Sequence, residues 1–307
     1  MGSDAPERIP ADDSRRSNPS SFYGAWLWSV GLIVARLLPA GVCEVVARTA
    51  VALYWHMAPH RREVVIQNLL PVLNGNRGEA RRAARRLFAN FATKVSDLWR
   101  FEGGTPVDTW LGKWSGWEIY QAANARGRGV LFVTPHLGNW EFGGAFMAKK
   151  GVKMLVLTQA EPDERLTELR QESRARWGIE TLVVGQDAFA FVEIIQRLNE
   201  GATVALLVDR PSAARAVTVE LFGRPFAASN AAAELARASG CAIVPVCVVR
   251  NDGHYAARIL PEIRYDRAAI GSREARIELT QEILRALEPA IRQHVEQWFH
   301  FVPVWPR

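Results

Sequence analysis

The chain has 307 residues, a formal net charge of +6 and a sequence pI near 9.5. Its hydrophobic content of 49% and charged content of 23% are typical of a folded protein with a real core, and its length allows one large α/β domain or two small ones. The basic excess serves general solubility or attracts anionic lipid and acidic carrier proteins. No basic block carries a recognisable nucleic-acid motif, so we expect no nucleic-acid partner.

The N-terminal part divides into a polar tail and an apolar region. Residues 1–21 are rich in Ser, Pro, Asp and Arg and have almost nothing apolar, which predicts a disordered tail and not a signal peptide. Residues 22–58 are predicted to form membrane-proximal apolar helices. Residues 59–307 show no internal repeat and no clear linker, which indicates one catalytic domain.

The uncharged run of residues 22–35 is shorter than the roughly 20 residues that a membrane-spanning helix needs. Extending it to residue 46 would bury Arg36 or Glu44 at a cost. We therefore expect a helix that lies in, or dips into, the membrane interface. A single span and a hydrophobic helix that caps the soluble core are the alternatives. Residues 47–57 predict a second apolar helix that packs on the first.

Residues 79–101 predict an amphipathic helix. Leu87, Phe91, Val95 and Leu98 recur at helical spacing, while arginines populate the other face. The helix either turns its apolar face to the core and its basic face to solvent, or rests that basic face on anionic phospholipid headgroups.

Beyond Gly112, short apolar runs alternate with helical stretches. This order is typical of an α/β domain with a mixed, largely parallel central sheet flanked by helices. The Asp252-Gly253 pair is a hairpin signal and predicts an antiparallel strand after it. The predicted strands are residues 130–134, 154–158, 181–184, 203–208, 217–222, 243–250 and 254–260, and the predicted helices are residues 142–150, 164–177, 187–199, 231–239 and 272–297.

The first predicted strand leads directly to a histidine and an acid. Pro135 ends the strand, and His136 and Glu141 follow five residues apart. On one straight helix these side chains would point about 140° apart and could not meet. With His136 on the turn, Glu141 in the first helical turn and Gly138 permitting the bend, the carboxylate would orient the imidazole and stabilise its protonated form. That pattern predicts a general base with its orienting acid, and the alternative is a structural histidine at a strand end.

Other kinds of active site have little support in the sequence. No H-E-x-x-H and no Cys/His cluster is present, so a zinc site is not expected. No G-x-S-x-G is present, which leaves a serine hydrolase unsupported. Cys43, Cys241 and Cys247 have no metal-binding spacing and lie in apolar contexts, which indicates reduced core residues. We expect neither a metal nor a cofactor.

Two further polar residues stand out from the apolar framework. Asp209 follows a predicted strand, at the end where open α/β sheets bind ligands. Arg174 precedes the strand that begins near Thr181, with Arg176 as the alternative arginine. Asp209 and Arg174 either take part in the site or form a structural ion pair at the strand ends.

The segment H-L-G-N-W-E, residues 136–141, resembles the H-x-x-x-x-[DE] motif of the lysophospholipid acyltransferase superfamily. Within it, the chain is most similar to the bacterial acyltransferases of lipid A and of phosphatidylinositol mannosides. That single motif is weak, but several blocks in the same order, spread from about residue 22 to the end, make the resemblance specific. The further blocks are residues 61–69, 206–210, 221–226, 234–246 and 296–305.

The resemblance implies a glycerolphosphate acyltransferase-like fold and acyl transfer from a thioester to a hydroxyl of a lipid or glycolipid. His136 would be the general base and Glu141 its partner, without a covalent acyl-enzyme. The donor would be acyl carrier protein or acyl-coenzyme A, as a substrate and not a cofactor. The resemblance also implies a place on the cytosolic face of a bacterial inner membrane, peripheral or single-pass. The matching substrate-binding positions are Arg174, Asp209, Gly138, Asn139, Arg210 and Arg224, and a solvent-facing turn is the alternative for Arg224.

The sequence departs from the lipid A branch in two places. Residues 298–305 read W-F-H-F-V-P-V-W, without that branch's paired arginines, and A-A-S-N-A-A-A-E-L-A lacks its glycine before the Leu-Ala helix. A glycolipid, an aminolipid or a lysophospholipid is therefore an alternative acceptor to lipid A. A catalytically silent lipid-binding scaffold and an acyl-thioesterase are the alternative functions. The intact pair of His136 and Glu141, together with Asp209, favours the transferase.

Overall fold

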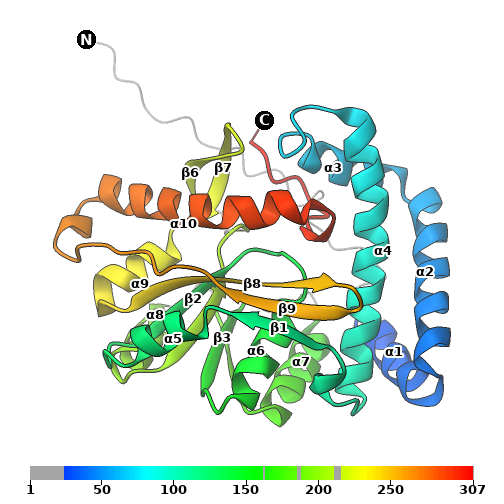
Figure 1. The fold of residues 1–307 in the computed structure, drawn as a ribbon, viewed down its shortest axis with the longest axis horizontal. Coiled ribbons are helices and arrows are strands. Elements are labelled where there is room, and N and C mark those ends of the chain that lie inside the picture. The colour runs from blue at the N-terminus through cyan, green and yellow to red at the C-terminus, as the bar shows by residue number, and fades with distance from the viewer. Residues whose placement is uncertain (1–23, 162, 185–187, 211–215, 307) are drawn as a thin grey trace.

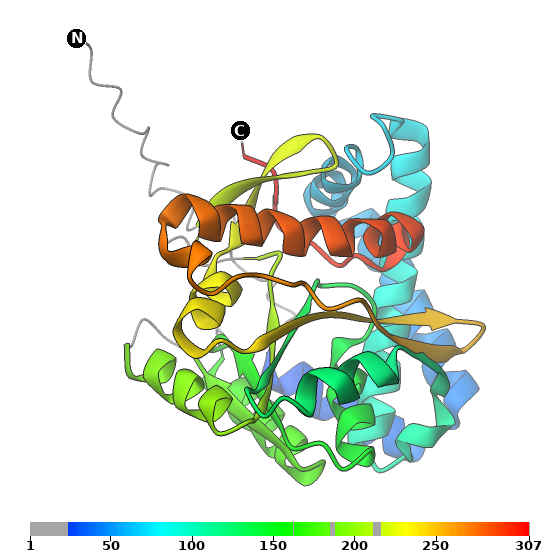
Figure 2. The same cartoon turned by 60° about the vertical axis from the view of Figure 1, so that its left-hand side comes forward.

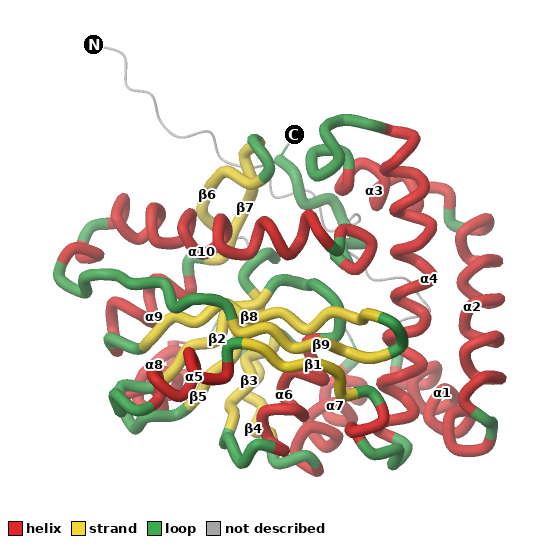
Figure 3. The backbone as a smooth tube through the Cα atoms, viewed as in Figure 1, coloured by secondary structure: helices red, strands yellow, loops and turns green. Residues whose placement is uncertain are grey.

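The computed structural model describes residues 24–161, 163–184, 188–210 and 216–306 (Figure 1). The predicted tail, residues 1–21, lies outside the described residues. The described part of the chain is an α/β fold in which helices flank a central sheet, as the sequence predicted (Figure 3).

Helices α1 (Ala25–Leu37) and α2 (Ala40–Met57) form the apolar N-terminal region. Pro39 separates them, because a proline forces the preceding residue into extended backbone, and Leu38 has φ −107° and ψ 145°. The second helix therefore begins at Ala40 and not at the predicted Ala47. None of the described helices is both long and apolar enough to cross a bilayer.

The two N-terminal helices pack on the long amphipathic helix α4 (Arg77–Glu102), and α3 (Pro59–Leu69) precedes it (Figure 1). Gly31 makes the close contact between α1 and α4 possible. A Cβ atom at this position would lie 2.2 Å from the ring of Trp99, so any larger residue would push the helices apart. The predicted core-facing side of α4 is confirmed, because Leu87 and Leu98 are buried.

The central sheet has seven strands in the order β1-β9-β8-β2-β5-β3-β4. All neighbouring strands are parallel except β8 and β9, which form the predicted antiparallel hairpin. The sequence missed β1, an edge strand that pairs with β9. The strands are β1 (Leu111–Ser115), β2 (Val130–Thr134), β3 (Met154–Thr158), β4 (Ile179–Val183), β5 (Thr203–Leu207), β8 (Ala242–Asn251) and β9 (His254–Ile259).

One predicted strand is not part of this sheet. Residues 217–222 were expected among the central strands, but β6 (Ala216–Leu221) pairs only with β7 (Arg224–Ser229), as a separate antiparallel hairpin. The sequence did not predict β7, because Pro225 and a short run of small residues hide its strand character. The hairpin lies beside α10 (Arg273–Gln293) and the C-terminal segment (Figure 2).

Both faces of the sheet are covered, and strand β2 contributes to each core. Leu131 and Val133 belong to the core that also holds residues of α8, α9 and α10, whereas Val130 and Phe132 face residues of α5 and α6. This alternation follows from the period of two along a strand. Every residue of β2 is buried, so the turn after it begins from a fixed position. The remaining helices are α5 (Trp117–Asn124), α6 (Trp140–Lys149), α7 (Glu164–Arg176), α8 (Ala188–Asn199) and α9 (Ala231–Ser239), with 3₁₀ turns at Val107–Thr109, Ala269–Gly271 and Val295–Gln297.

Candidate active site

The candidate site lies where the central parallel strands β2 and β5 end. Thr134 at the end of β2 pairs with Leu207 at the end of β5. His136 follows the first strand and Asp209 the second, so both side chains are placed at the carboxyl edge of the sheet, where α/β folds bind ligands.

His136 and Asp209 are in direct contact. Nδ1 of His136 lies 2.6 Å from Oδ1 of Asp209, and the backbone N–H of His136 donates to both carboxylate oxygens at 3.1 and 2.9 Å. The His136 side chain keeps 15% of its surface exposed, while that of Asp209 is fully buried. If Nδ1–H donates to the carboxylate, Nε2 carries the free lone pair that a general base needs.

The electrostatics of the pair keep the carboxylate charged and the imidazole neutral. Burial alone would raise the pKa of Asp209, but its interactions with His136 and His300 outweigh burial and hold this pKa well below its usual range. Burial lowers the pKa of His136, and Asp209 opposes only part of that effect. A histidine with a lowered pKa is in its basic form at neutral pH.

The C-terminal segment completes the surroundings of Asp209. Oδ2 accepts hydrogen bonds from Nε1 of Trp298 at 2.8 Å and contacts Nε2 of His300 at 2.9 Å. The N–H of Phe299 donates to the carbonyl of His136 at 2.8 Å. The sequence did not predict the contact of His300 with Asp209. The W-F-H run in the C-terminal block was the signal that could have found it.

Asn68 on α3 fixes this C-terminal segment. Its Nδ2 donates to the carbonyls of His300 at 3.0 Å and Val302 at 2.8 Å, and its Oδ1 accepts from the N–H of Val304 at 3.2 Å. Arg61, seven residues before Asn68 on α3, donates to the carbonyl of Phe301 at 2.8 Å. The first and last blocks of the family resemblance, residues 61–69 and 296–305, are therefore joined by hydrogen bonds. The second of them also contacts the backbone of His136.

The expected contact between Glu141 and His136 is not formed among the described residues, where Glu141 pairs with two arginines instead. Glu141 accepts two hydrogen bonds from Arg174, at 2.9 and 2.7 Å, and one from Arg170 at 2.7 Å. The physical reason is the position of α7, which presents both guanidinium groups to the first turn of α6. These charges outweigh the effect of burial and lower the pKa of Glu141 far below its usual value.

Arg174, and not Arg176, is the arginine at the site. Arg174 is buried beside Glu141, whereas Arg176 on the same helix is exposed. The alternative of an ion pair between Arg174 and Asp209 is not what the structure shows, because each has a different partner. The charged cluster extends to Glu102, which accepts a hydrogen bond from Nε1 of Trp28 on α1 at 2.7 Å.

Gly138 and Asn139 shape the turn that carries His136. Gly138 has φ +62°, and a Cβ atom there would lie 1.9 Å from the carbonyl oxygen of Val248. Its N–H donates to the carbonyl of Gln297, and the N–H of Asn139 donates to that of Val248. Asn139 is completely buried. These contacts tie the turn to β8 and the C-terminal segment, and substrate binding by the two residues stays a prediction.

The two remaining predicted arginines differ in their distance from the base. Arg210 follows Asp209 directly, is exposed, and is close enough for its charge to lower the pKa of His136. Arg224 is exposed at the tip of the β6–β7 hairpin, which agrees with the alternative of a solvent-facing turn arginine.

Three of these side chains also form a set with metal-binding atoms. One nitrogen or oxygen atom from each of His136, Asp209 and His300 lies within 4.8 Å of the others. Both carboxylate oxygens already accept hydrogen bonds, from the two imidazoles, from Trp298 and from the backbone of His136. The geometry is therefore that of a hydrogen-bonded cluster centred on a carboxylate, and the absence of a metal stays a prediction.

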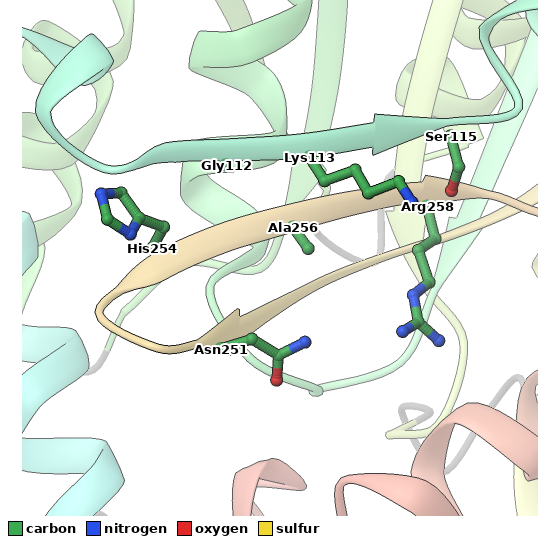
Figure 4. Close-up of a pocket in the computed structure, with 7 residues that line it drawn as sticks. All are labelled: Gly112, Lys113, Ser115, Asn251, His254, Ala256 and Arg258. Carbon is green, nitrogen blue, oxygen red and sulfur yellow. The ribbon is translucent and has the colours of Figure 1, made fainter.

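One cavity lies elsewhere, along β1 and β9. It measures about 520 Å³, and the labelled side chains of Lys113, Asn251, His254 and Arg258 spread apart along it (Figure 4). None of the predicted site residues lines this groove.

The fold and the site define an α/β protein with a buried histidine–aspartate pair at the carboxyl edge of its sheet. The model of the bacterial lipid A biosynthesis acyltransferase family matches residues 11–307, so the chain belongs to this family of acyltransferases. The phosphatidylinositol mannoside acyltransferase of Mycolicibacterium smegmatis is 25% identical over 189 residues, which are 61% of this chain and 60% of the relative. The protein of the same name from Mycobacterium tuberculosis is 24% identical over 192 residues, which are 62% of this chain and 58% of the relative. The chain thus matches less than two thirds of these relatives' length.

Proposed function

We propose that the protein is a membrane-associated O-acyltransferase that moves a fatty acyl chain from a thioester donor to a hydroxyl of a lipid or glycolipid acceptor. The observation that carries the proposal is the contact of 2.6 Å between His136 and Asp209 at the carboxyl edge of the sheet. Family membership and the printed names of the relatives support the reaction class.

His136 is the general base of the proposed reaction. Its Nε2 accepts the proton of the acceptor hydroxyl as the hydroxyl oxygen attacks the thioester carbonyl. The tetrahedral intermediate then collapses, the carbon–sulfur bond breaks, and the leaving thiolate takes the proton from the imidazolium. Asp209 fixes the tautomer with the proton on Nδ1 and balances the positive charge that develops on the ring. The acceptor is itself the nucleophile, so no acyl-enzyme is needed.

The proposed role of Glu141 is to position two arginines by hydrogen bonds. Its carboxylate fixes Arg170 and Arg174 at the start of α6, next to the turn that carries His136. Arg174, held by Glu141 through Nε and Nη2, is the arginine that we propose for the phosphate-bearing arm of either donor, acyl carrier protein or coenzyme A. Arg210 is a second cation near the imidazole.

The outer faces of α1 and α2 are the surface proposed to contact the membrane. Large apolar side chains are exposed on both helices at helical spacing, and such patches mark interaction surfaces. We propose peripheral attachment to the cytosolic face of a bacterial inner membrane through this surface. The exposed residues are Trp26, Val30, Ile33, Leu37, Leu38, Val42, Val45, Val46, Leu53 and Met57.

The proposal is tested with the purified full chain in detergent. Acyl-coenzyme A and acyl carrier protein thioesters are offered in turn with a phosphatidylinositol mannoside, a lipid A precursor and a lysophospholipid, and mass spectrometry follows acyl gain. We expect one donor and acceptor pair to give product with wild type and with the control His254→Ala, an exposed histidine of the β8–β9 turn. Release of free fatty acid without acceptor acylation would instead indicate a thioesterase.

A further inference from the structure

A second cavity, of about 300 Å³, lies between the start of α2, the middle of α4 and the β8–β9 turn. It is separate from the histidine–aspartate pair, because neither His136 nor Asp209, nor the side chains of Trp298 and His300 that contact Asp209, line it. In Figure 1, α2 and α4 run side by side at the edge of the molecule, with the β8–β9 turn against α4. The polar residues that line it are Glu44, Thr93, Ser96, Asp97, Arg100, Thr109 and Arg250.

The cavity presents donors that have no acceptor in the described structure. Ser96 is only 5% exposed, and its hydroxyl has no hydrogen-bond partner among the described residues. Arg100 forms no ion pair with any described residue, and its guanidinium lies 4.9 Å from the ring centre of Trp110. Ala40 and Gly41 add first-turn N–H groups of α2, which have no acceptor inside the helix. Together they form a set of donors suited to an anion.

The two carboxylates at the cavity already have partners. Asp97 accepts a hydrogen bond from the hydroxyl of Tyr255 at 3.0 Å and lies 3.4 Å from Nε of Arg250. Glu44 pairs with Arg48 on the next turn of α2 at 3.5 Å. Each carboxylate therefore has an arginine other than Arg100 within ion-pair distance, although the charge of Arg100 also acts on Asp97.

The surroundings of the cavity favour an anion that is attached to apolar chains. Leu37 and Leu38 precede the first turn of α2, Val42 lies in it and Val45 follows it, all with exposed side chains. We propose that the cavity binds the phosphate of an anionic phospholipid headgroup while these apolar residues enter the acyl region. This proposal deepens the membrane attachment proposed above and rests on it.

The test measures vesicle sedimentation of the full chain with two kinds of vesicle. Both consist of a neutral galactolipid, and they carry either phosphatidylglycerol or oleate at equal surface charge. The variants are Arg100→Gln and Ser96→Ala, and Arg100→Lys keeps the charge. The control is Arg86→Gln, which removes an exposed charge from α4 outside the cavity.

We expect Arg100→Gln to weaken binding to phosphatidylglycerol vesicles about tenfold, as for a lost charge-assisted hydrogen bond. Ser96→Ala should weaken it about threefold, and Arg100→Lys should retain most of it. On oleate vesicles, Arg100→Gln should match Arg86→Gln. Equal losses for Arg100→Gln and Arg86→Gln on both vesicles would overturn the proposal, because attraction would then depend on net charge alone.

Inorganic phosphate separates a lipid headgroup from a free anion. We expect it to compete weakly with phosphatidylglycerol vesicles for wild type and not for Arg100→Gln. If calorimetry shows that Arg100→Gln abolishes phosphate binding while the same variant binds vesicles like wild type, the cavity binds free phosphate. That result would contradict the proposal of a lipid headgroup. Acyl transfer in detergent is measured on the same samples, so a failure of the catalytic proposal is seen independently of this one.

Discussion

The imidazole of His136 is held by Asp209, 73 positions along the chain, with Nδ1 2.6 Å from Oδ1. Glu141, only five residues beyond the histidine, instead neutralises two arginines. The acid of the H-x-x-x-x-E motif and the acid that contacts the base are thus different residues, and we expect different effects when each is replaced.

Replacing Asp209 with asparagine should damage catalysis without removing the base. The side chain stays the same size but no longer fixes the tautomer or balances the imidazolium, so we expect kcat to fall roughly 10²–10⁴-fold. Circular dichroism and thermal unfolding show whether the variant is folded. A folded Asp209→Asn protein within a few-fold of wild-type kcat would contradict the assignment of Asp209.

The same variant should shift the pH profile in a fixed direction. Burial lowers the pKa of His136 below 6.5, so the base stays neutral and kcat/KM stays high to pH values below 6.5. Asp209 raises this pKa, so its removal should move the acid limb of kcat/KM to still lower pH. A limb that moves to higher pH in Asp209→Asn would show that the titrating group is not this imidazole.

Glu141→Gln should be costly for stability. It leaves Arg170 and Arg174 buried beside an uncharged amide, and breaking a buried pair costs about 3–5 kcal/mol of unfolding free energy. The control is Glu63→Gln, whose partner Arg77 lies on the surface at 2.9 Å and whose loss should cost about 1 kcal/mol or less. Urea denaturation measures both, and equal small losses would contradict the structural role of Glu141.

Low pH should remove the stabilisation that Glu141 gives through its ion pairs with Arg170 and Arg174. The folded-state pKa of Glu141 lies below its ordinary value of 4.5, so its contribution is complete above pH 4.5 and is lost as the pH falls toward the folded-state pKa. The difference in unfolding free energy between wild type and Glu141→Gln should therefore shrink below pH 4.5. A difference that grows on acidification would have the wrong sign.

Gly138→Ala tests the turn that carries the base. A methyl group would meet the carbonyl oxygen of Val248 at 1.9 Å, so the turn must shift and His136 with it. Gly127→Ala is the control, because Gly127 has φ +67° but no atom within 4 Å of the added group. We expect about 1–2 kcal/mol for the control, from left-handed backbone alone, and a clearly larger loss with impaired activity for Gly138→Ala. Equal losses for the two variants would contradict the close approach.

Val45→Glu should weaken membrane binding through α2. Val45 is 63% exposed on the proposed membrane surface, and Val192 is 61% exposed on α8, which makes Val192→Glu a matched control. A charge placed in the apolar surface loses burial and adds a desolvation cost, so we expect vesicle partitioning to fall about tenfold or more. Similar losses for the two variants would mean that α1 and α2 are not the membrane surface.

The sequence predicted the strands best where an apolar run has clear ends. Strands β2 and β3 begin and end at the predicted residues, because their apolar runs are bounded by glycine, proline or polar residues. Strand β1 was missed, since Gly112 and Lys113 interrupt its apolar pattern and it lies at the sheet edge. Whether β6 joins the sheet depends on long-range pairing, which local pattern does not contain.

The site was predicted in part for the same reason. His136, Asp209 and Arg174 were recognised from their places beside predicted strands, but their pairing was not. The partner of His136 is set by the register of β2 against β5, and that of Glu141 by the packing of α7 on α6. His300 reaches Asp209 only because Asn68 fixes the C-terminal segment. None of these contacts is local in sequence.

The most direct test compares the lipids of cells that express wild type with those of cells that express His136→Ala, using mass spectrometry with a suitable acceptor present. The account predicts a lipid or glycolipid that gains one acyl chain with wild type alone, because losing the general base should slow transfer roughly 10²–10⁴-fold. The same acylated species at near wild-type levels with folded, membrane-bound His136→Ala would contradict the account. No acylated species with either protein would favour a lipid-binding scaffold.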